Sequence, residues 1–280
     1  MGIETSLVGQ KGKEFCEFPK ETTNPRLKKN RRRQRKQTMI QTVFETCKEV
    51  FSNGRTGFVP RPEDVERLRS VLDRLKPSDV GLSPDMRYFR AEETERTPVI
   101  TYLHLHECEK FSMGIFCLPP SGVLPLHNHP GMTVFSKLLF GAMHMKSYDW
   151  AIEKPCSSVS ISGALQIEGK VAQLAKLQVD ADFTAPCDTS ILYPAAGGNM
   201  HCFTALTACA IVDVLGPPYS EPDGRHCTYY LEYPFDSFSV DGIAVPEDEK
   251  ESYSWLQERE KPEDLAVVGA IYSGPKIVEV

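Results

Sequence analysis

The sequence predicts an all-β fold, a sandwich or barrel of short strands, with two N-terminal helices packed outside it. Three observations support this prediction. Apolar residues recur at helical spacing over residues 38–75, whereas after about residue 95 they recur at every second position. Turns rich in Gly and Pro separate the later runs, and no helical pattern interrupts them.

The elements follow in order along the chain. Helical spacing predicts a first helix over 38–51 and a second that begins at Pro62 and ends before Pro77. The acidic stretch 247–264 is expected to be a surface excursion, and residues 266–280 a terminal pair of strands. The apolar or alternating runs predict strands at 99–106, 111–118, 133–140, 142–148, 171–176, 190–193, 201–206, 209–215 and 227–233.

Composition narrows the class of protein. With 41% hydrophobic residues, the 280-residue chain can build a sizeable core. It has neither an apolar run of membrane-spanning length nor a signal-peptide pattern, so we expect a soluble intracellular protein with no membrane partner. The nine cysteines are odd in number, scattered and without a CxxC pair, which indicates reduced thiols, mostly in the core.

Residues 1–37 are polar, charged and without apolar periodicity, and are expected to form a disordered arm ahead of one domain over 38–280. Arg26–Lys36 carries eight basic residues and no acid, which is typical of a nuclear localisation signal and predicts residence in nucleus and cytoplasm. A solvated charge block is the alternative, and Met1–Ser6 also fits a myristoylation pattern. A basic arm on an acidic body does not indicate a nucleic-acid-binding domain.

Three histidines form a candidate metal site. His127 and His129 are two residues apart, so on a strand both imidazoles would face one ion. That spacing alone is a weak signal. It gains weight from His201, which follows the Gly197-Gly198 turn on another part of the chain. A purely structural role for the three remains the alternative.

Other histidines are weaker candidates. His104 and His106 have the same spacing but lack flanking turns, so they are expected to lie on a polar face. His144, between Met143 and Met145, is expected to be a barrel histidine with its hydrogen bonds satisfied. His226 is expected in a loop.

The segments around the three histidines resemble the paired motifs of the cupin barrels, which implies a double-stranded β-helix, or jelly roll. Gly141 keeps its place in the first motif, but Val134 stands where cupins have Glu. In the second motif Pro194 and Gly198 occur at altered spacing, and Ala205 takes the usual Asn position.

The missing carboxylate favours thiol chemistry. Three neutral imidazoles leave Fe(II) its full charge, whereas the commoner oxygenase triad includes a carboxylate. A more positive ion binds a thiolate well, and three protein ligands leave positions open for the thiolate and dioxygen.

Four segments carry a wider resemblance: Pro119–Ser121, Leu126–Val134, Ser136–Leu138 and Met145–Trp150. Over about residues 38–280 the chain resembles the plant cysteine oxidases, relatives of the animal cysteamine dioxygenases. This resemblance implies an Fe(II) enzyme that uses O2 to convert an N-terminal protein cysteine to the sulfinic acid. The implied targets are ethylene-response group VII transcription factors, which are then arginylated and degraded, so that the enzyme reports oxygen supply.

The resemblance implies iron ligands at His127, His129 and His201 and active-site roles for Asp213, Tyr219 and Cys227. Asp213 follows an apolar run, where a carboxylate needs a partner such as a substrate ammonium or, alternatively, an Arg or backbone amides. Tyr219 could donate to iron-bound oxygens or simply pack at a Pro-rich bend. Cys227 could act in the site or be a core thiol.

The sequence is also compatible with three rival functions. A dioxygenase of free cysteine or cysteamine would use the same ligands. A zinc hydrolase or hydratase also suits three histidines with an open position. A non-catalytic cupin module would bind metal without turnover. The expected oligomeric state is a monomer, and the expected partners are N-terminal-Cys proteins and O2.

Overall fold

The computed structural model describes residues 37–90, 97–151, 164–167, 170–239 and 245–279. Residues 37–280 group into one compact unit. The predicted disorder and nuclear signal of the N-terminal arm lie outside the described residues, and the proposed domain boundary stays a prediction.

Both predicted helices are confirmed, and each is slightly shorter than expected. Helix α1 spans Met39–Val50, and the Thr38 side chain caps it by accepting a hydrogen bond from a backbone N–H. Helix α2 spans Pro62–Leu72, with its proline in the first turn, where no N–H is needed. Short 3-10 helices lie at Pro77–Val80, Arg87–Phe89, Glu221–Asp223, Phe235–Ser237 and Glu247–Ser252.

Two sheets form the rest of the domain. The first contains, in order, β13 (Val267–Ala270), β1 (Ile100–Glu107), β2 (Ser112–Leu118), β10 (Cys209–Gly216), β4 (Thr133–Phe140) and β8 (Ser190–Leu192). The second contains β12 (Tyr253–Arg259), β11 (Tyr229–Pro234), β3 (Val123–Asn128), β9 (Met200–Ala205), β5 (Ala142–Trp150), β7 (Lys170–Thr184) and β6 (Ala164–Ile167).

The order of these strands is that of a double-stranded β-helix. From β2 to β5 and again from β8 to β11, the chain alternates between the two sheets, and the two runs interleave within each sheet. Strand β7 also pairs with β12, which closes six strands of the second sheet into a ring. The predicted all-β cupin fold is therefore confirmed.

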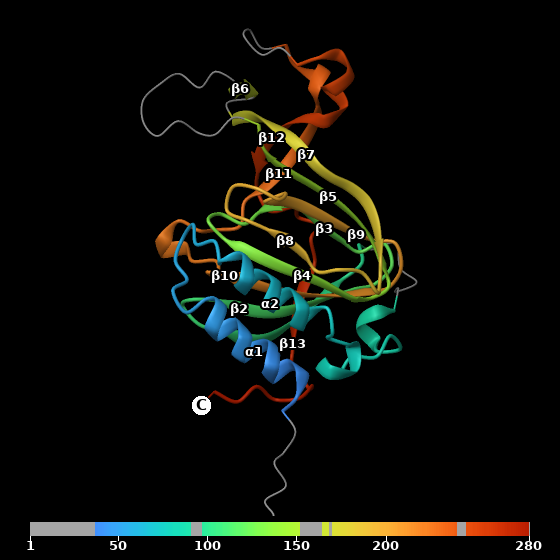
Figure 1. Cartoon of the computed structure of the whole chain (residues 1–280). Coiled ribbons are helices and arrows are strands. Elements are labelled where there is room, and N and C mark those ends of the chain that lie inside the picture. Colours follow the sequence, from blue (N-terminus) through green and yellow to red (C-terminus); the bar gives the residue numbers. More distant parts are fainter. Residues whose placement is uncertain (1–36, 91–96, 152–163, 168–169, 240–244, 280) are drawn as a thin grey trace, which may run out of the picture. The chain divides into compact units, whose positions relative to one another are not determined.

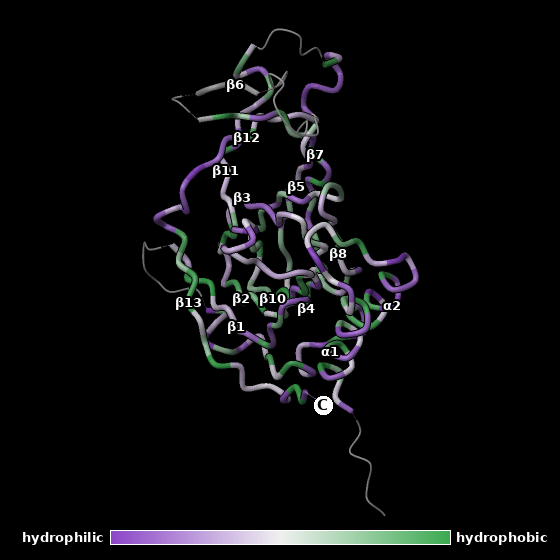
Figure 2. The backbone as a smooth tube through the Cα atoms, turned by 90° about the vertical axis from the view of Figure 1, so that its left-hand side faces the viewer, coloured by the Kyte–Doolittle hydropathy of each residue, from purple (hydrophilic) through white to green (hydrophobic). Residues whose placement is uncertain are grey.

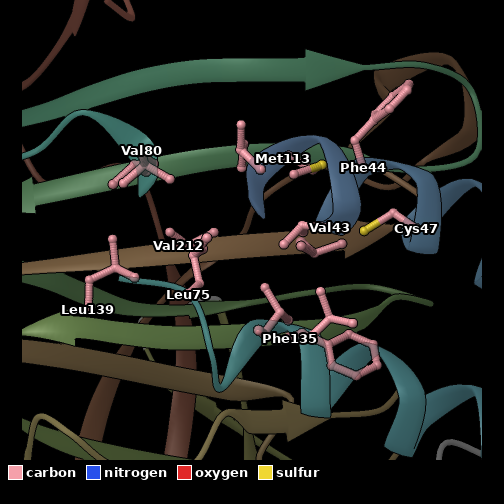
Figure 3. Close-up of a cluster of buried hydrophobic side chains, with 14 of the residues drawn as sticks. Val43, Phe44, Cys47, Leu75, Val80, Met113, Phe135, Leu139 and Val212 are labelled. Atoms are coloured by element: carbon pink, nitrogen blue, oxygen red, sulfur yellow. The ribbon is translucent and has the colours of Figure 1, made fainter. Parts of the chain in front are cut away.

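The helices cover the outer face of the first sheet. In Figure 1 α1 and α2 lie against the strands β2, β10 and β4. Successive side chains of β10 point to opposite faces of the sheet. Val212 therefore points toward Val43 and its neighbours, as Figure 3 shows, and Asp213 points to the opposite face. Figure 2 shows hydrophobic and hydrophilic residues alternating along both helices, as their one-sided burial requires.

Two predictions near the C-terminus were wrong. The stretch 247–264 is not only a surface excursion, because it contains β12, whose Trp255 and Leu256 are each 1% exposed. The expected pair of strands over 266–280 is a single strand, β13, within the described residues. The run at 171–176 is the start of a strand that continues to Thr184.

Candidate metal centre

The three predicted histidines meet at one point between β3 and β9. Each offers a ring nitrogen, and these ligand atoms all lie within 4.8 Å of one another. Strand register explains the meeting, because His127 is the direct partner of His201, while His129 follows the last residue of β3. The Nε2 atoms of His129 and His201 are 2.9 Å apart. A single ion could therefore bind all three rings.

Hydrogen bonds at the outer nitrogens of His127 and His129 leave the inner nitrogens of these two rings free for a metal. Nδ1 of His127 lies 2.8 Å from the Pro125 carbonyl, so it carries the proton. Nδ1 of His129 lies 3.0 Å from the Tyr219 hydroxyl, which itself donates to the Asn128 carbonyl at 2.8 Å. Because that hydroxyl proton is committed to the carbonyl, the His129 Nδ1–H is the donor to the tyrosine oxygen.

Burial keeps the triad in the neutral form that binds metal. It lowers the pKa of all three rings, and the mutual repulsion of the rings adds to this for His129 and His201. For His127 the bond to Pro125 opposes the effect of burial. Three neutral imidazoles whose ligand nitrogens lie within 4.8 Å of one another, without a carboxylate among them, fit a divalent cation.

Asn199 holds the backbone of His129 in place, a contact that sequence reasoning missed. Its Oδ1 accepts from the His129 N–H at 3.2 Å, and its Nδ2 donates to the His129 carbonyl at 2.9 Å and to the Tyr193 carbonyl at 2.8 Å. Asp149 on β5 accepts in turn from the backbone N–H groups of Gly198 and Asn199 at 2.9–3.0 Å. The Asn199 side chain, which is 8% exposed, thus joins the two ligand segments.

The turn before His201 requires glycine. Gly198 has φ +84°, and a Cβ there would lie 2.3 Å from Oγ of Ser147. Ser147 pairs with His201 in the sheet, so a side chain at 198 would collide with the strand that flanks the ligand. The glycine turn that pointed to His201 is thus a packing requirement of the site.

All three further predicted residues line one pocket with His127 and His129. The pocket has a volume of about 420 Å³ and also includes the apolar side chains Phe116, Leu124 and Phe203. Asp213 points into it from β10 and is 4% exposed, with Oδ1 lacking a hydrogen-bond partner within the described residues. Burial raises the pKa of Asp213 to about 6, although a hydrogen bond from Ser136 opposes this.

Tyr219 and Cys227 lie next to each other in this pocket. The Cys227 thiol is in hydrogen-bonding contact with the hydroxyls of Tyr219 and Tyr229. Burial raises the pKa of Cys227 above its usual value, which keeps the thiol protonated. Tyr219 reaches His129 rather than standing alone at a bend, and its hydroxyl is engaged by protein atoms.

Tyr102 is a further pocket residue that no local pattern indicated. Its ring lies over Gly114, where a Cβ would come within 2.4 Å of the hydroxyl and Cε2. Gly114 is the direct strand partner of Asp213. Burial and the nearby Asp213 charge raise the pKa of Tyr102 to about 12, so the phenol remains a neutral donor beside the carboxylate.

The other histidines lie outside the triad, as expected. His104 is exposed, as expected of a polar face. The same prediction was wrong for His106, which is 9% exposed and packs on Phe44 with ring centroids 4.7 Å apart, because the strand register shifts between the two histidines. His144 is not inside the barrel: it lies partly exposed, 2.7–2.9 Å from the carboxylates of Asp180 and Asp182.

The cysteines of the described residues are all free thiols. Three are buried, three are partly buried and one is exposed, which matches the expectation of mostly reduced core residues. None of the helices in the described ranges has the length and apolar character needed to cross a membrane.

Comparison with known proteins gives a consistent set of relatives. A profile of the PCO_ADO family matches residues 71–277. The chain is 57% identical to plant cysteine oxidase 2 of Arabidopsis thaliana, covering 100% of both chains, and 58% identical to plant cysteine oxidase 1 of the same plant, covering 86% of this chain and 80% of that one. It is 29% identical to the 2-aminoethanethiol dioxygenase of Mus musculus, over 81% of this chain and 90% of that one.

Solved structures with weak overall superposition include an RmlC-like cupin protein from Desulfovibrio desulfuricans. It has a TM-score of 0.28 and 18% identity, and it covers 48% of this chain and 98% of that one.

Proposed function

Because the chain belongs to the PCO_ADO family, as a thiol dioxygenase of the plant cysteine oxidase type, we propose that it oxidises the N-terminal cysteine of other proteins to cysteine sulfinic acid. The overall change, R–SH plus O2 giving R–SO2H, balances without a reductant, since sulfur loses the four electrons that O2 gains. Fe(II) held by the triad would supply adjacent open positions for thiolate and O2 and the electronic coupling between them.

One observation carries the choice of substrate: Oδ1 of Asp213, which has no hydrogen-bond partner among the described residues, belongs to the same pocket as His127 and His129. An N-terminal cysteine carries an ammonium two carbons away from its sulfur. The carboxylate can accept a hydrogen bond from that ammonium while the sulfur lies at the histidines. Since the ammonium supplies a partner for Oδ1 in addition to the Ser136 bond, binding offsets part of the desolvation cost of the buried carboxylate.

The charge of the lining favours a peptide over free cysteine. Free cysteine brings a carboxylate, which would need a cation. Among the lining residues in the described part of the chain, Lys261 is the single cation, and it is exposed. In a peptide the same carbonyl is an uncharged amide. The aromatic and aliphatic walls contributed by Phe116, Leu124 and Phe203 then exclude water from the reacting sulfur.

The wider role belongs to the same proposal. The substrates are group VII ethylene-response transcription factors, and their oxidation feeds an arginine N-degron pathway that responds to oxygen. The enzyme works as a monomer in the nucleus and cytoplasm. The basic run Arg26–Lys36 and the 57% identity to a plant cysteine oxidase support this assignment.

The test compares thiols under air and under nitrogen. Iron-loaded protein is incubated with a Cys-initiated peptide, its N-acetylated form, free cysteine and cysteamine, and products are measured by mass spectrometry. We expect a gain of two oxygen atoms, both from ¹⁸O2, for the free peptide, and loss of turnover on acetylation or with His201→Ala. If the acetylated peptide were oxidised equally well, Asp213 would not bind the substrate ammonium. If no thiol gave an oxygen-dependent product, the proposed dioxygenase function would be excluded.

A further inference from the structure

The outer edge of β13 forms part of the mouth of the thiol pocket. Val267 and Gly269 line the same cavity as His127, together with Lys261 and Leu265 from the segment just before the strand. Lys261, Val267 and Gly269 are exposed, so this side of the pocket is open to solvent. A peptide whose first residue lies at the histidines can leave the pocket past this strand.

Strand register shows which backbone groups β13 leaves free. Strand β13 pairs with β1 alone, in parallel, with Ile100 opposite Val267 and Tyr102 opposite Gly269. The Ile100 N–H donates to the Ala266 carbonyl at 2.9 Å, which sets the alternation of the ladder. Val268 and Ala270 therefore face β1, whereas Val267 and Gly269 direct their N–H and C=O groups to the outer edge.

Within the described residues, no strand covers that edge. Val267 is 36% exposed and Val268 is 48% exposed, and β13 is the terminal strand of its sheet. Figure 2 shows β13 as a largely hydrophobic segment beside β1. An open edge with alternating free donors and acceptors is a site to which an extended peptide can add as a further strand.

We infer that the free edge of β13 binds the main chain of the substrate beyond its N-terminal cysteine, by adding the peptide to the first sheet. This rests on the proposed function. Val267 and Gly269 contribute to both features. They line the pocket, and their backbone N–H and C=O groups form the free edge of β13. A peptide anchored at the histidines and at Asp213 would thus pass directly onto Val267 and Gly269.

In this kind of recognition the enzyme hydrogen-bonds to the main chain of the substrate peptide and not to its side chains. This mode of binding predicts that the residues after the cysteine must be able to extend, and that their side-chain identity matters less than their N–H groups. Gly269 suits the position because a Cβ there would meet nothing within 4 Å, so the approach to the edge is open.

The main experiment is an N-methyl scan of a peptide substrate of about ten residues with unaltered iron-loaded enzyme. Each peptide carries one N-methyl group after the cysteine, and kcat and KM are measured by mass spectrometry. We expect KM to rise about threefold to tenfold at alternate positions, since one backbone hydrogen bond is lost there. Methylation at the intervening residues, whose N–H groups point to solvent, is the matched control.

A pair of variants tests the protein side. Gly269→Pro removes an edge-facing N–H without breaking the ladder to β1, whereas Gly269→Ala keeps it. We expect KM for the long peptide to be about threefold to tenfold higher in the proline variant than in the alanine variant. The difference between the two variants should disappear for cysteine amide, which is too short to reach β13.

The outcomes separate the two proposals. If Cys-initiated peptides are oxidised but KM does not alternate along the scan, or the two variants do not differ, edge pairing is excluded and the thiol dioxygenase function stands. If no Cys-initiated peptide is oxidised, the proposed function fails, and edge pairing fails with it.

Discussion

The hydroxyl of Tyr219 lies 3.0 Å from Nδ1 of His129 and at the same time donates to the carbonyl of Asn128 at 2.8 Å. The tyrosine thereby fixes which nitrogen of His129 carries the proton and which is free to bind metal. It is a positioning residue, because it acts through the ligand and through the backbone next to it.

Replacing Tyr219 by Phe should weaken metal binding about tenfold to hundredfold, because His129 would lose the acceptor that orients its ring. Fe(II) or Co(II) affinity measured by calorimetry checks this. Tyr229→Phe is the control, since it removes a hydroxyl that contacts Cys227 in the same pocket and keeps the aromatic ring that lies near His127. Equal affinities in the two variants would contradict the role assigned to Tyr219.

Asn199→Ala should lower the free energy of unfolding by about 1–3 kcal/mol, since it removes the side chain that hydrogen-bonds the buried N–H of His129 and the carbonyl of Tyr193. The His129 carbonyl would keep only its bond from the Met132 N–H. The substitution should also lower metal affinity, because His129 lies one residue beyond the end of β3 and depends on this clamp. Urea unfolding with and without metal checks both effects. A variant with full stability and full metal affinity would show that the strand alone holds the ligand.

Asp213→Asn should stabilise the metal-free protein at neutral pH. Burial raises the pKa of Asp213 from 3.8 to about 6, so the folded state holds the proton more tightly than the unfolded state. The contribution of this side chain to stability is therefore greatest below the unfolded value and is lost as the pH rises through about 6. The substitution Asp213→Asn should therefore raise the free energy of unfolding more above this pH than at acidic pH. The difference between the two conditions should be at most about 3 kcal/mol.

Urea unfolding of the metal-free protein at pH values of about 4 and about 7.5 measures this difference. Glu107→Gln, which removes an exposed carboxylate from the same pocket, is the control. The explanation by burial is wrong if Asp213→Asn gives the same stability change at both pH values. Activity with a Cys-initiated peptide should fall in the variant, because the ammonium loses its counter-charge.

Gly198→Ala should destabilise the protein more than Gly224→Ala. Both positions have positive φ, +84° and +70°, and share a conformational cost of about 1–2 kcal/mol. At Gly224 a Cβ would meet nothing within 4 Å, whereas at Gly198 it would collide with Ser147. Thermal unfolding measures how much more stability Gly198→Ala loses than Gly224→Ala. Metal affinity should fall in Gly198→Ala only. Equal losses would mean that the turn adjusts without disturbing His201.

The sequence alone predicted the residues whose signal is local. The spacing of His127 and His129, and the glycine turn before His201, are patterns within a few residues, and the strands that carry them obey period-two alternation. The family resemblance supplied Asp213, Tyr219 and Cys227, and the structure brings Asp213, Tyr219 and Cys227 into one pocket with the ligands. Their chemical roles stay predictions.

Contacts made across the sheet by register could not be predicted in this way. Tyr102 reaches the neighbourhood of Asp213 only because β2 lies between their strands with a glycine at the crossing. Asn199 clamps a residue 70 positions earlier. Strand β12 was missed because polar residues occupy buried positions in it: Ser254 is 6% and Gln257 5% exposed, so hydropathy indicated a surface segment.

The pairing of β12 with both β11 and β7 has a consequence for the order of synthesis. The metal ligands are translated by residue 201, but the strand that closes the ring and the segment that borders the pocket come from residues 253–270. A nascent chain on the ribosome therefore carries its histidines long before it has an enclosed place for a thiol. The pocket beside these ligands is complete only after residues 253–270 have emerged and β12 has paired with β11 and β7.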